Sequence, residues 1–163
     1  MEWASSRVCT KQLRNSDIRN MDTLMNLLHS QACSLVVENT DGEVTTYSKK
    51  GVRDLVWLLD NEPERLQDAR IADKVVGKAA AGLIVRGGAR EVYADVMSRL
   101  ALPLFDEAGI PYTYGELVDR IVIPEGDDRC PLERIVSEAR TATEVENLLR
   151  QHFAEMQARH LQT

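Results

Sequence analysis

The chain has 163 residues, of which 44% are hydrophobic and 28% charged, and its formal net charge is −6 at pH 7. This length and composition are typical of one globular domain with a substantial core. The acidic balance argues against a general nucleic-acid-binding protein, which needs a basic face. The longest uncharged apolar run, at 79–85, is too short to cross a membrane, and the N-terminus lacks the apolar stretch of a secretory signal. Three cysteines without framework spacing indicate a reduced, cytoplasmic protein.

Hydrophobic patterning divides the chain into three segments. These are a polar N-terminal extension over 1–20, a main domain over 21–140 and a C-terminal helix over 141–163. Leucines at helical spacing after Asp22 predict the first helix of the main domain. An Asp-Gly turn at 41–42, between two β-rich runs, predicts a hairpin. Apolar residues at helical spacing over 51–61 predict a second helix.

Residues 71–82, IADKVVGKAAAG, are predicted as a buried helix that ends at Gly87-Gly88. On such a helix Lys74 and Lys78 share one face, where like charges destabilise by roughly 0.2–0.5 kcal/mol. Gly77 adds a cost of up to about 1 kcal/mol relative to alanine. Close packing of small residues against a sheet is one explanation of Gly77, and a ligand is the other.

The remaining elements complete an alternating pattern. Residues 90–96 predict a strand, and 98–109 predict a helix capped by Ser98, in which Pro103 requires a kink or a late start. Further extended segments are expected at 110–117 and 120–125, a loop at 125–129, a helix opened by Pro131, and a final helix opened by the capping box of Thr141 and Glu144. A hairpin followed by alternating helices and strands predicts an α/β domain with helices on a mixed sheet.

The first candidate site is the start of the helix predicted at 71–82. A helix N-terminus offers unpaired N–H groups, and Lys74 and Lys78 add charge that a phosphate or carboxylate would neutralise. Asp73 would then orient a lysine or accept a hydrogen bond from a ligand hydroxyl. Alternatively, both lysines reach solvent and Asp73 only complements the helix dipole.

The second candidate site is the segment 127–133, DDRCPLE. A thiol at a helix N-terminus has a lowered pKa, which makes Cys130 the most reactive cysteine on physical grounds, with Glu133 as a conceivable base. The structural alternative is a capping box in which Glu133 folds back onto the N–H of Cys130. The three histidines have no metal-binding partner at helical spacing, and the sequence has no phosphate loop, nucleophile elbow or dinucleotide fingerprint.

The segments IADKVVGKAAAGLIVRGG, VYADVMS and CPLE resemble an uncharacterised bacterial and archaeal family of domains of unknown function with a cytidine-deaminase-like fold. The similarity extends over about residues 22–138. It implies a three-layer α/β domain, with a mixed five-stranded sheet and helices on both faces. The family pattern maps onto two groups of residues, namely Asp73, Lys74, Gly77 and Lys78 in one segment and Cys130, Pro131 and Glu133 in the other.

The same resemblance limits the expected chemistry. Zinc deaminases hold their metal with His (or Cys)-x-Glu and Pro-Cys-x-x-Cys motifs, and this sequence has neither. We therefore expect no metal, no cofactor and no zinc-dependent deamination. The crevice at the carboxyl ends of the strands remains the expected ligand site. Asp95 and Ser98 are further candidates to line it, or else a strand-end residue and a helix cap.

Two functions of different kinds follow. The leading hypothesis is a metal-free site for a small anionic or nucleotide-like ligand, with or without catalysis. The other is a non-catalytic interaction or regulatory domain that uses the apolar stripe of the last helix, a stripe that core packing would equally explain. A thiol redox sensor through Cys130 is a third reading, and the sequence leaves a homo-oligomer open.

Overall fold

The computed structural model describes residues 7–12, 21–49, 52–122 and 131–161. Its strands are β1 (Arg7–Gln12), β2 (Leu35–Glu38), β3 (Glu43–Tyr47), β4 (Arg70–Val76), β5 (Glu91–Ser98) and β6 (Tyr112–Val118). Its helices are α1 (Met21–Ser30), α2 (Arg53–Asn61), α3 (Lys78–Gly87), α4 (Leu102–Ala108), α5 (Pro131–Ile135) and α6 (Ala142–Leu161), with short 3₁₀ helices η2 (Pro63–Arg65) and η3 (Arg99–Ala101).

One mixed sheet organises the domain, with the strand order β1-β3-β2-β4-β5-β6. Strands β2 to β6 form the predicted mixed five-stranded sheet. Strand β1 adds a sixth strand beside β3, so part of the segment predicted as a polar extension belongs to the sheet. Strand β2 is antiparallel to both β3 and β4, and β4, β5 and β6 are parallel. The carboxyl ends of β3, β4, β5 and β6 therefore meet at the same edge.

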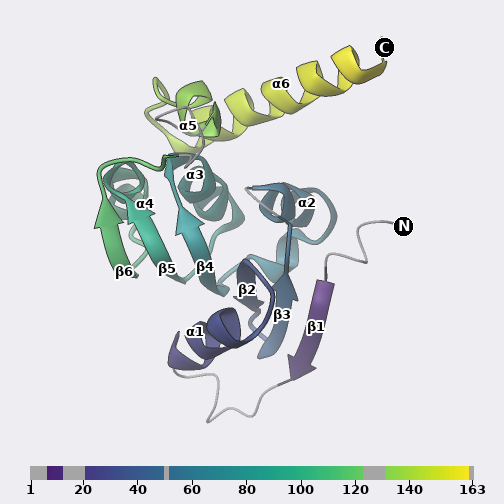
Figure 1. Cartoon of the computed structure of the whole chain (residues 1–163), viewed down its shortest axis with the longest axis vertical. Helices are drawn as coiled ribbons and strands as arrows, with labels where there is room; N and C mark the ends of the chain where they lie inside the picture. The colour runs from purple at the N-terminus through teal and green to yellow at the C-terminus, as the bar shows by residue number, and fades with distance from the viewer. Residues whose placement is uncertain (1–6, 13–20, 50–51, 123–130, 162–163) are drawn as a thin grey trace.

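Helices cover both faces of the sheet, as expected (Figure 1). Helix α1 buries Met21, Leu24 and Leu28 against one face. Helices α2, α3 and α4 pack on the opposite face, in the larger core, around fully buried side chains such as Leu58 and Phe105. The result is an α/β domain of three layers. Its larger core lies between the sheet and the layer formed by α2, α3 and α4.

The prediction of a helix throughout 71–82 is wrong, because residues up to Val76 belong to strand β4 and the helix begins only at Lys78. Strand β4 is central, paired with β2 on one side and with β5 on the other. A strand buried on both faces has a nearly continuous apolar run instead of an alternating one, which makes it hard to distinguish from a buried helix. Lys74 and Lys78 therefore do not share a helix face.

The other predicted elements are largely confirmed. In the hairpin turn Gly42 adopts a positive φ of 82°. Helix α3 ends at Gly87 and is capped by Gly88, whose φ is 79°. Helix α4 starts late, at Leu102, as Pro103 requires. The capping box of α6 is present, since the main-chain N–H of Glu144 donates to Thr141 Oγ1 at 3.1 Å. Residues 120–122 are not a strand, and the expected loop at 125–129 lies outside the described residues.

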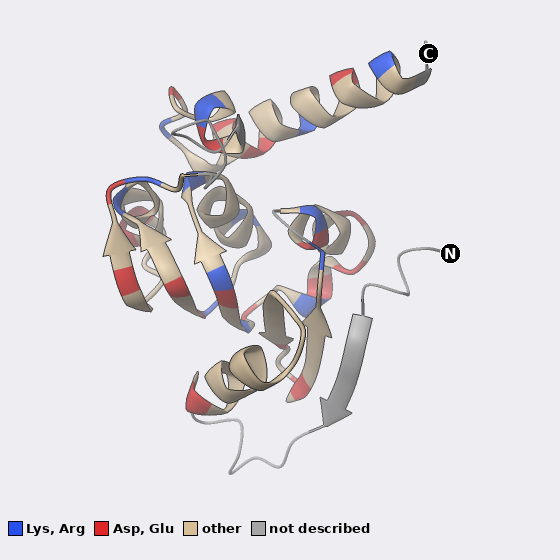
Figure 2. Cartoon of the chain, in the orientation of Figure 1, with Lys and Arg blue, Asp and Glu red and all other residues tan. Residues whose placement is uncertain are grey.

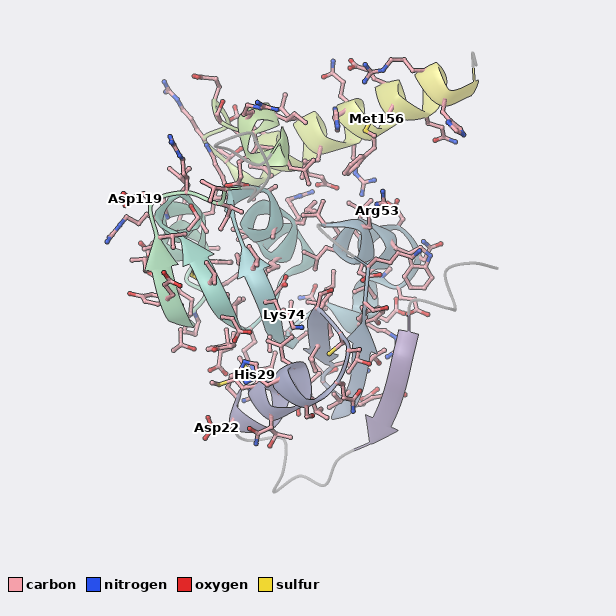
Figure 3. The ribbon with its side chains drawn as sticks, viewed as in Figure 1. Asp22, His29, Arg53, Lys74, Asp119 and Met156 are labelled. Carbon is pink, nitrogen blue, oxygen red and sulfur yellow. The ribbon has the colours of Figure 1, made fainter. Side chains whose placement is uncertain are left out.

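Helix α6 has two different halves. Val145 and Leu149 in its first half are fully buried in the main core, which supports the interpretation of the apolar stripe as core packing. The second half extends beyond the rest of the domain (Figure 1), and Met156 there is 47% exposed (Figure 3). Basic and acidic residues are interspersed along the chain (Figure 2). In the part of the chain that the structure describes, no helix combines the length and apolarity needed to span a bilayer.

The contact between α3 and α6 depends on Gly82. A Cβ atom at this position would lie 2.4 Å from Cγ1 of Val145. We predict that Gly82→Ala lowers the free energy of unfolding by about 1–3 kcal/mol, because overpacking outweighs the better helix propensity of alanine. Urea denaturation measures this change. The penalty should shrink in the Val145→Ala background, and an unchanged penalty there would contradict the proposed contact.

Candidate functional site

A cavity of about 330 Å³ lies at the carboxyl end of β4. It is bounded by the ends of several elements, namely Ser34 before β2, Val52 before α2, the end of β4 and the beginning of α3, Ile121 after β6, and α5. Its side chains are mostly apolar and include Val52, Ala80, Ile121 and Leu132, whereas Asp73, Lys74 and Glu133 supply the charges. This volume and lining are typical of small-molecule sites, and the position is the usual one in open α/β sheets.

Glu133 binds the N-terminus of helix α3 from another helix, α5. Its Oε1 accepts the main-chain N–H of Lys78 at 2.9 Å, and its Oε2 accepts that of Ala79 at 3.0 Å. The side chain is only 4% exposed. A carboxylate in this position satisfies two otherwise unpaired N–H groups and complements the positive end of the helix dipole. The predicted role of Glu133 as the cap of its own helix is therefore replaced by a long-range cap.

Gly77 makes room for this carboxylate. A Cβ atom on Gly77 would lie 2.7 Å from the Cδ and both carboxylate oxygens of Glu133. The side chain of Lys78 extends to α5 as well, where its Nζ donates to the carbonyl of Ser137 at 3.1 Å. The anion position predicted at the start of this helix is thus filled by the chain's own carboxylate, and Lys78 does not line the cavity.

Asp73 is the buried acid of the cavity, with 7% exposure. Its Oδ1 accepts the main-chain N–H of Val75 at 3.3 Å. Burial is the main cause that raises the pKa of this carboxyl to about 7, and the nearby carboxylates of Asp54 and Asp95 raise it further, against the opposing effect of the main-chain N–H groups of Val75 and Lys74. Asp73 is therefore poised to exchange a proton near neutral pH, which is a property of many functional carboxyls.

Asp54 is the neighbouring acid that the sequence reasoning did not single out. It lies in the first turn of α2, is 3% exposed, and accepts the main-chain N–H of Lys49 through Oδ2 at 2.9 Å. Its position beside Asp73 follows from the crossover that brings the start of α2 to the carboxyl edge of β4. Only the sheet topology reveals this pairing, because the two residues are far apart in the sequence.

Lys74 is the lysine among the residues that line the cavity. It follows Asp73 on β4, is exposed, and lies close to the middle of the molecule in Figure 3. Its ammonium group also acts on Cys33, where it opposes the effect of burial, which raises the pKa of that thiol. A buried thiol with a raised pKa is a poor nucleophile. Cys130 lies outside the described residues.

Asp95 and Ser98, the other predicted ligand-binding residues, do not line this cavity. Asp95 Oδ1 accepts the hydroxyl of Tyr93 and contacts His29 Nε2, each at 2.7 Å. Ser98 is fully buried and caps η3 by accepting the main-chain N–H of Leu100 at 3.1 Å. Among the residues that the structure describes, no group of three or more His, Cys, Asp or Glu side chains could hold a metal ion.

The chain belongs to the family described as domain of unknown function DUF1893 (TM1506), whose model matches residues 23–153. Its fold is similar to that of the crystal structure of a DUF1893 family protein (TM1506) from Thermotoga maritima. The TM-score is 0.74 at 22% sequence identity, over 86% of this chain and 93% of that chain. A comparison with curated proteins gives no match. The family match covers strands β2 to β6, the residues that line the cavity and the first half of α6.

The raised pKa of Asp73 has a consequence for stability. The folded state keeps the proton up to about pH 7, whereas the unfolded chain releases it near pH 3.9, so stability contributed by this group is lost as the pH rises between these values. We predict that Asp73→Asn is more stable than the native protein at pH 8, by roughly 2–4 kcal/mol, and that the difference shrinks towards pH 4. Urea unfolding at several pH values measures the difference. A difference independent of pH would refute the assignment.

The cap provided by Glu133 is tested by truncation. We predict that Glu133→Ala destabilises the protein by about 1–2 kcal/mol, because two main-chain donors lose their acceptors. Hydrogen exchange should show loss of protection at the amides of Lys78 and Ala79. The exposed Glu138, which follows the end of α5, is the control, and its replacement by alanine should change stability by less than about 0.5 kcal/mol. Equal effects of the two variants would contradict the cap.

Proposed function

We propose that this domain is a metal-free binding domain for a small nucleotide-like ligand, held in the cavity at the carboxyl end of β4. The observation that carries the proposal is the buried carboxyl of Asp73 on the wall of a mostly apolar cavity of about 330 Å³. An isolated buried carboxyl is destabilising, so its presence in a cavity favours a role in binding or catalysis over a role in packing.

The cavity offers different chemistry to the two ends of such a ligand. Apolar side chains, among them Val52, Ala80 and Leu132, suit a flat ring. The exposed ammonium of Lys74 suits an anionic group such as a phosphate. Lys78, the second lysine of the predicted anion site, is not assigned to the ligand, because its Nζ donates to the carbonyl of Ser137.

We also propose that the scaffold is cytidine-deaminase-like. Supporting this are the mixed five-stranded part of the sheet and the helices on both faces, which the resemblance in the sequence implies. The deaminase motifs for zinc are missing from the sequence. The proposed activity is therefore binding in the crevice of such a scaffold without metal-dependent deamination.

The competing function is an interaction or regulatory domain that uses α6. Burial of Val145 and Leu149 in the core accounts for half of the apolar stripe and weakens that alternative. Its remaining candidate is the projecting half of α6 around Met156.

A thermal-shift screen against nucleosides, nucleotides, sugar phosphates and small carboxylates tests the proposal. A ligand at 100 times its Kd should stabilise the protein by about 2.7 kcal/mol. We predict a hit among phosphorylated compounds that is lost in Lys74→Ala and retained in the matched variant Lys78→Ala. No stabilisation by any compound would refute the binding function, and a dimer broken by Met156→Glu would then favour the interaction domain.

A further inference from the structure

The inner end of the cavity is acidic, although the sequence pattern predicts an anion site at this place. Asp73 and Glu133 line it, and Asp54 is close enough to Asp73 to raise its pKa. The first amides of α3, which would otherwise attract an anion, are bound by Glu133 at 2.9 and 3.0 Å. A phosphate or carboxylate placed here would meet carboxylates and no free helix terminus, so it would be repelled.

Asp73 itself retains capacity to accept hydrogen bonds. It accepts hydrogen bonds from the main-chain N–H groups of Val75 and Lys74, and within the described residues no side chain donates to it. A carboxylate has about four lone-pair positions, so the cavity side of this group can accept further donors. At 7% exposure the group lies more than nine-tenths buried, where hydrogen bonds to a charge are strongest.

We propose that the inner end of the cavity selects ligands that carry an amine, amide or amidinium group, and that Asp73 determines this specificity. The inference rests on the proposed function, because it concerns the ligand of the same cavity. A planar N–H donor pair matches a carboxylate in two parallel hydrogen bonds. The anionic part of the ligand then lies at the mouth, beside Lys74, so the two ends of the ligand meet opposite charges.

The charges around Asp73 predict the pH dependence of this recognition. Asp54 on α2 and Asp95 on β5 both raise its pKa, Glu133 on α5 lines the same cavity, and Lys74 is its neighbour on β4. Burial, with the carboxylates of Asp54 and Asp95 adding to it, favours the protonated form of Asp73 in the empty cavity. A cationic ligand binds the ionised form, so its affinity increases as the pH rises through about 7, the pKa of the carboxyl.

Benzamidine, benzamide and benzoate are suitable probes, because they share one ring and differ in the charge of the same end. We expect benzamidine to bind at least about tenfold more tightly than benzoate at pH 8, as measured by calorimetry. Its affinity should increase about tenfold from pH 6 to pH 8, in proportion to the ionised fraction of Asp73. Amide shifts in NMR spectra should centre on Val75, Ala80 and Leu132, which places the probe in the cavity.

Two variants separate the role of Asp73 from that of the cavity. Asp73→Asn should abolish both the preference for benzamidine and its pH dependence, whereas Lys78→Ala, at a residue that does not line the cavity, should keep both. Equal binding of the three probes, tighter binding of benzoate, or a preference that persists in Asp73→Asn would overturn the inference and leave the binding function standing. If no probe binds, the inference is overturned, and the ligand screen decides separately whether the binding function is also wrong.

Discussion

The carboxylate of Glu133 on the first amides of α3 is the contact on which the geometry of the site depends. It joins α5 to the start of α3 through two hydrogen bonds, and it requires glycine at position 77 because a Cβ there would lie 2.7 Å from it. Residues on both sides of this contact line the cavity, so the wall contributed by α5 is fixed relative to β4 by this cap. The lysine at position 78 reinforces it through the carbonyl of Ser137.

Because the cap uses the helix terminus internally, the cavity differs from the common anion sites of α/β proteins. In those sites free N–H groups at a helix start bind the phosphate of the ligand. Here the chain's own carboxylate, that of Glu133, occupies these N–H groups. A second acid, Asp73, remains buried with a pKa of about 7. Retaining such a group lowers stability above neutral pH, which is the compromise expected where a site is organised for binding and not for packing.

The sequence predicts the elements of this fold better than it predicts the site. Helical spacing, the Asp-Gly turn and the capping box of Thr141 are local signals, and the structure confirms the elements that they indicate. Strand β4 was missed because a central buried strand lacks the alternation that identifies strands. The contact between Gly77 and Glu133 spans more than fifty residues, and the electrostatic effect of Asp54 on Asp73 depends on the crossover after β3. No local pattern in the sequence contains either of them.

Asp73, Lys74, Gly77 and Lys78 therefore separate into two roles. Gly77 and Lys78 hold α5 in place, and their explanation is complete without a ligand. Asp73 and Lys74 have no comparable structural explanation, since a buried carboxyl beside an exposed lysine contributes nothing that an apolar pair on β4 would not contribute at lower cost. The first pair contributes to stability, and the function we propose gives recognition to the second, although all four residues lie within six positions on a single strand and helix start.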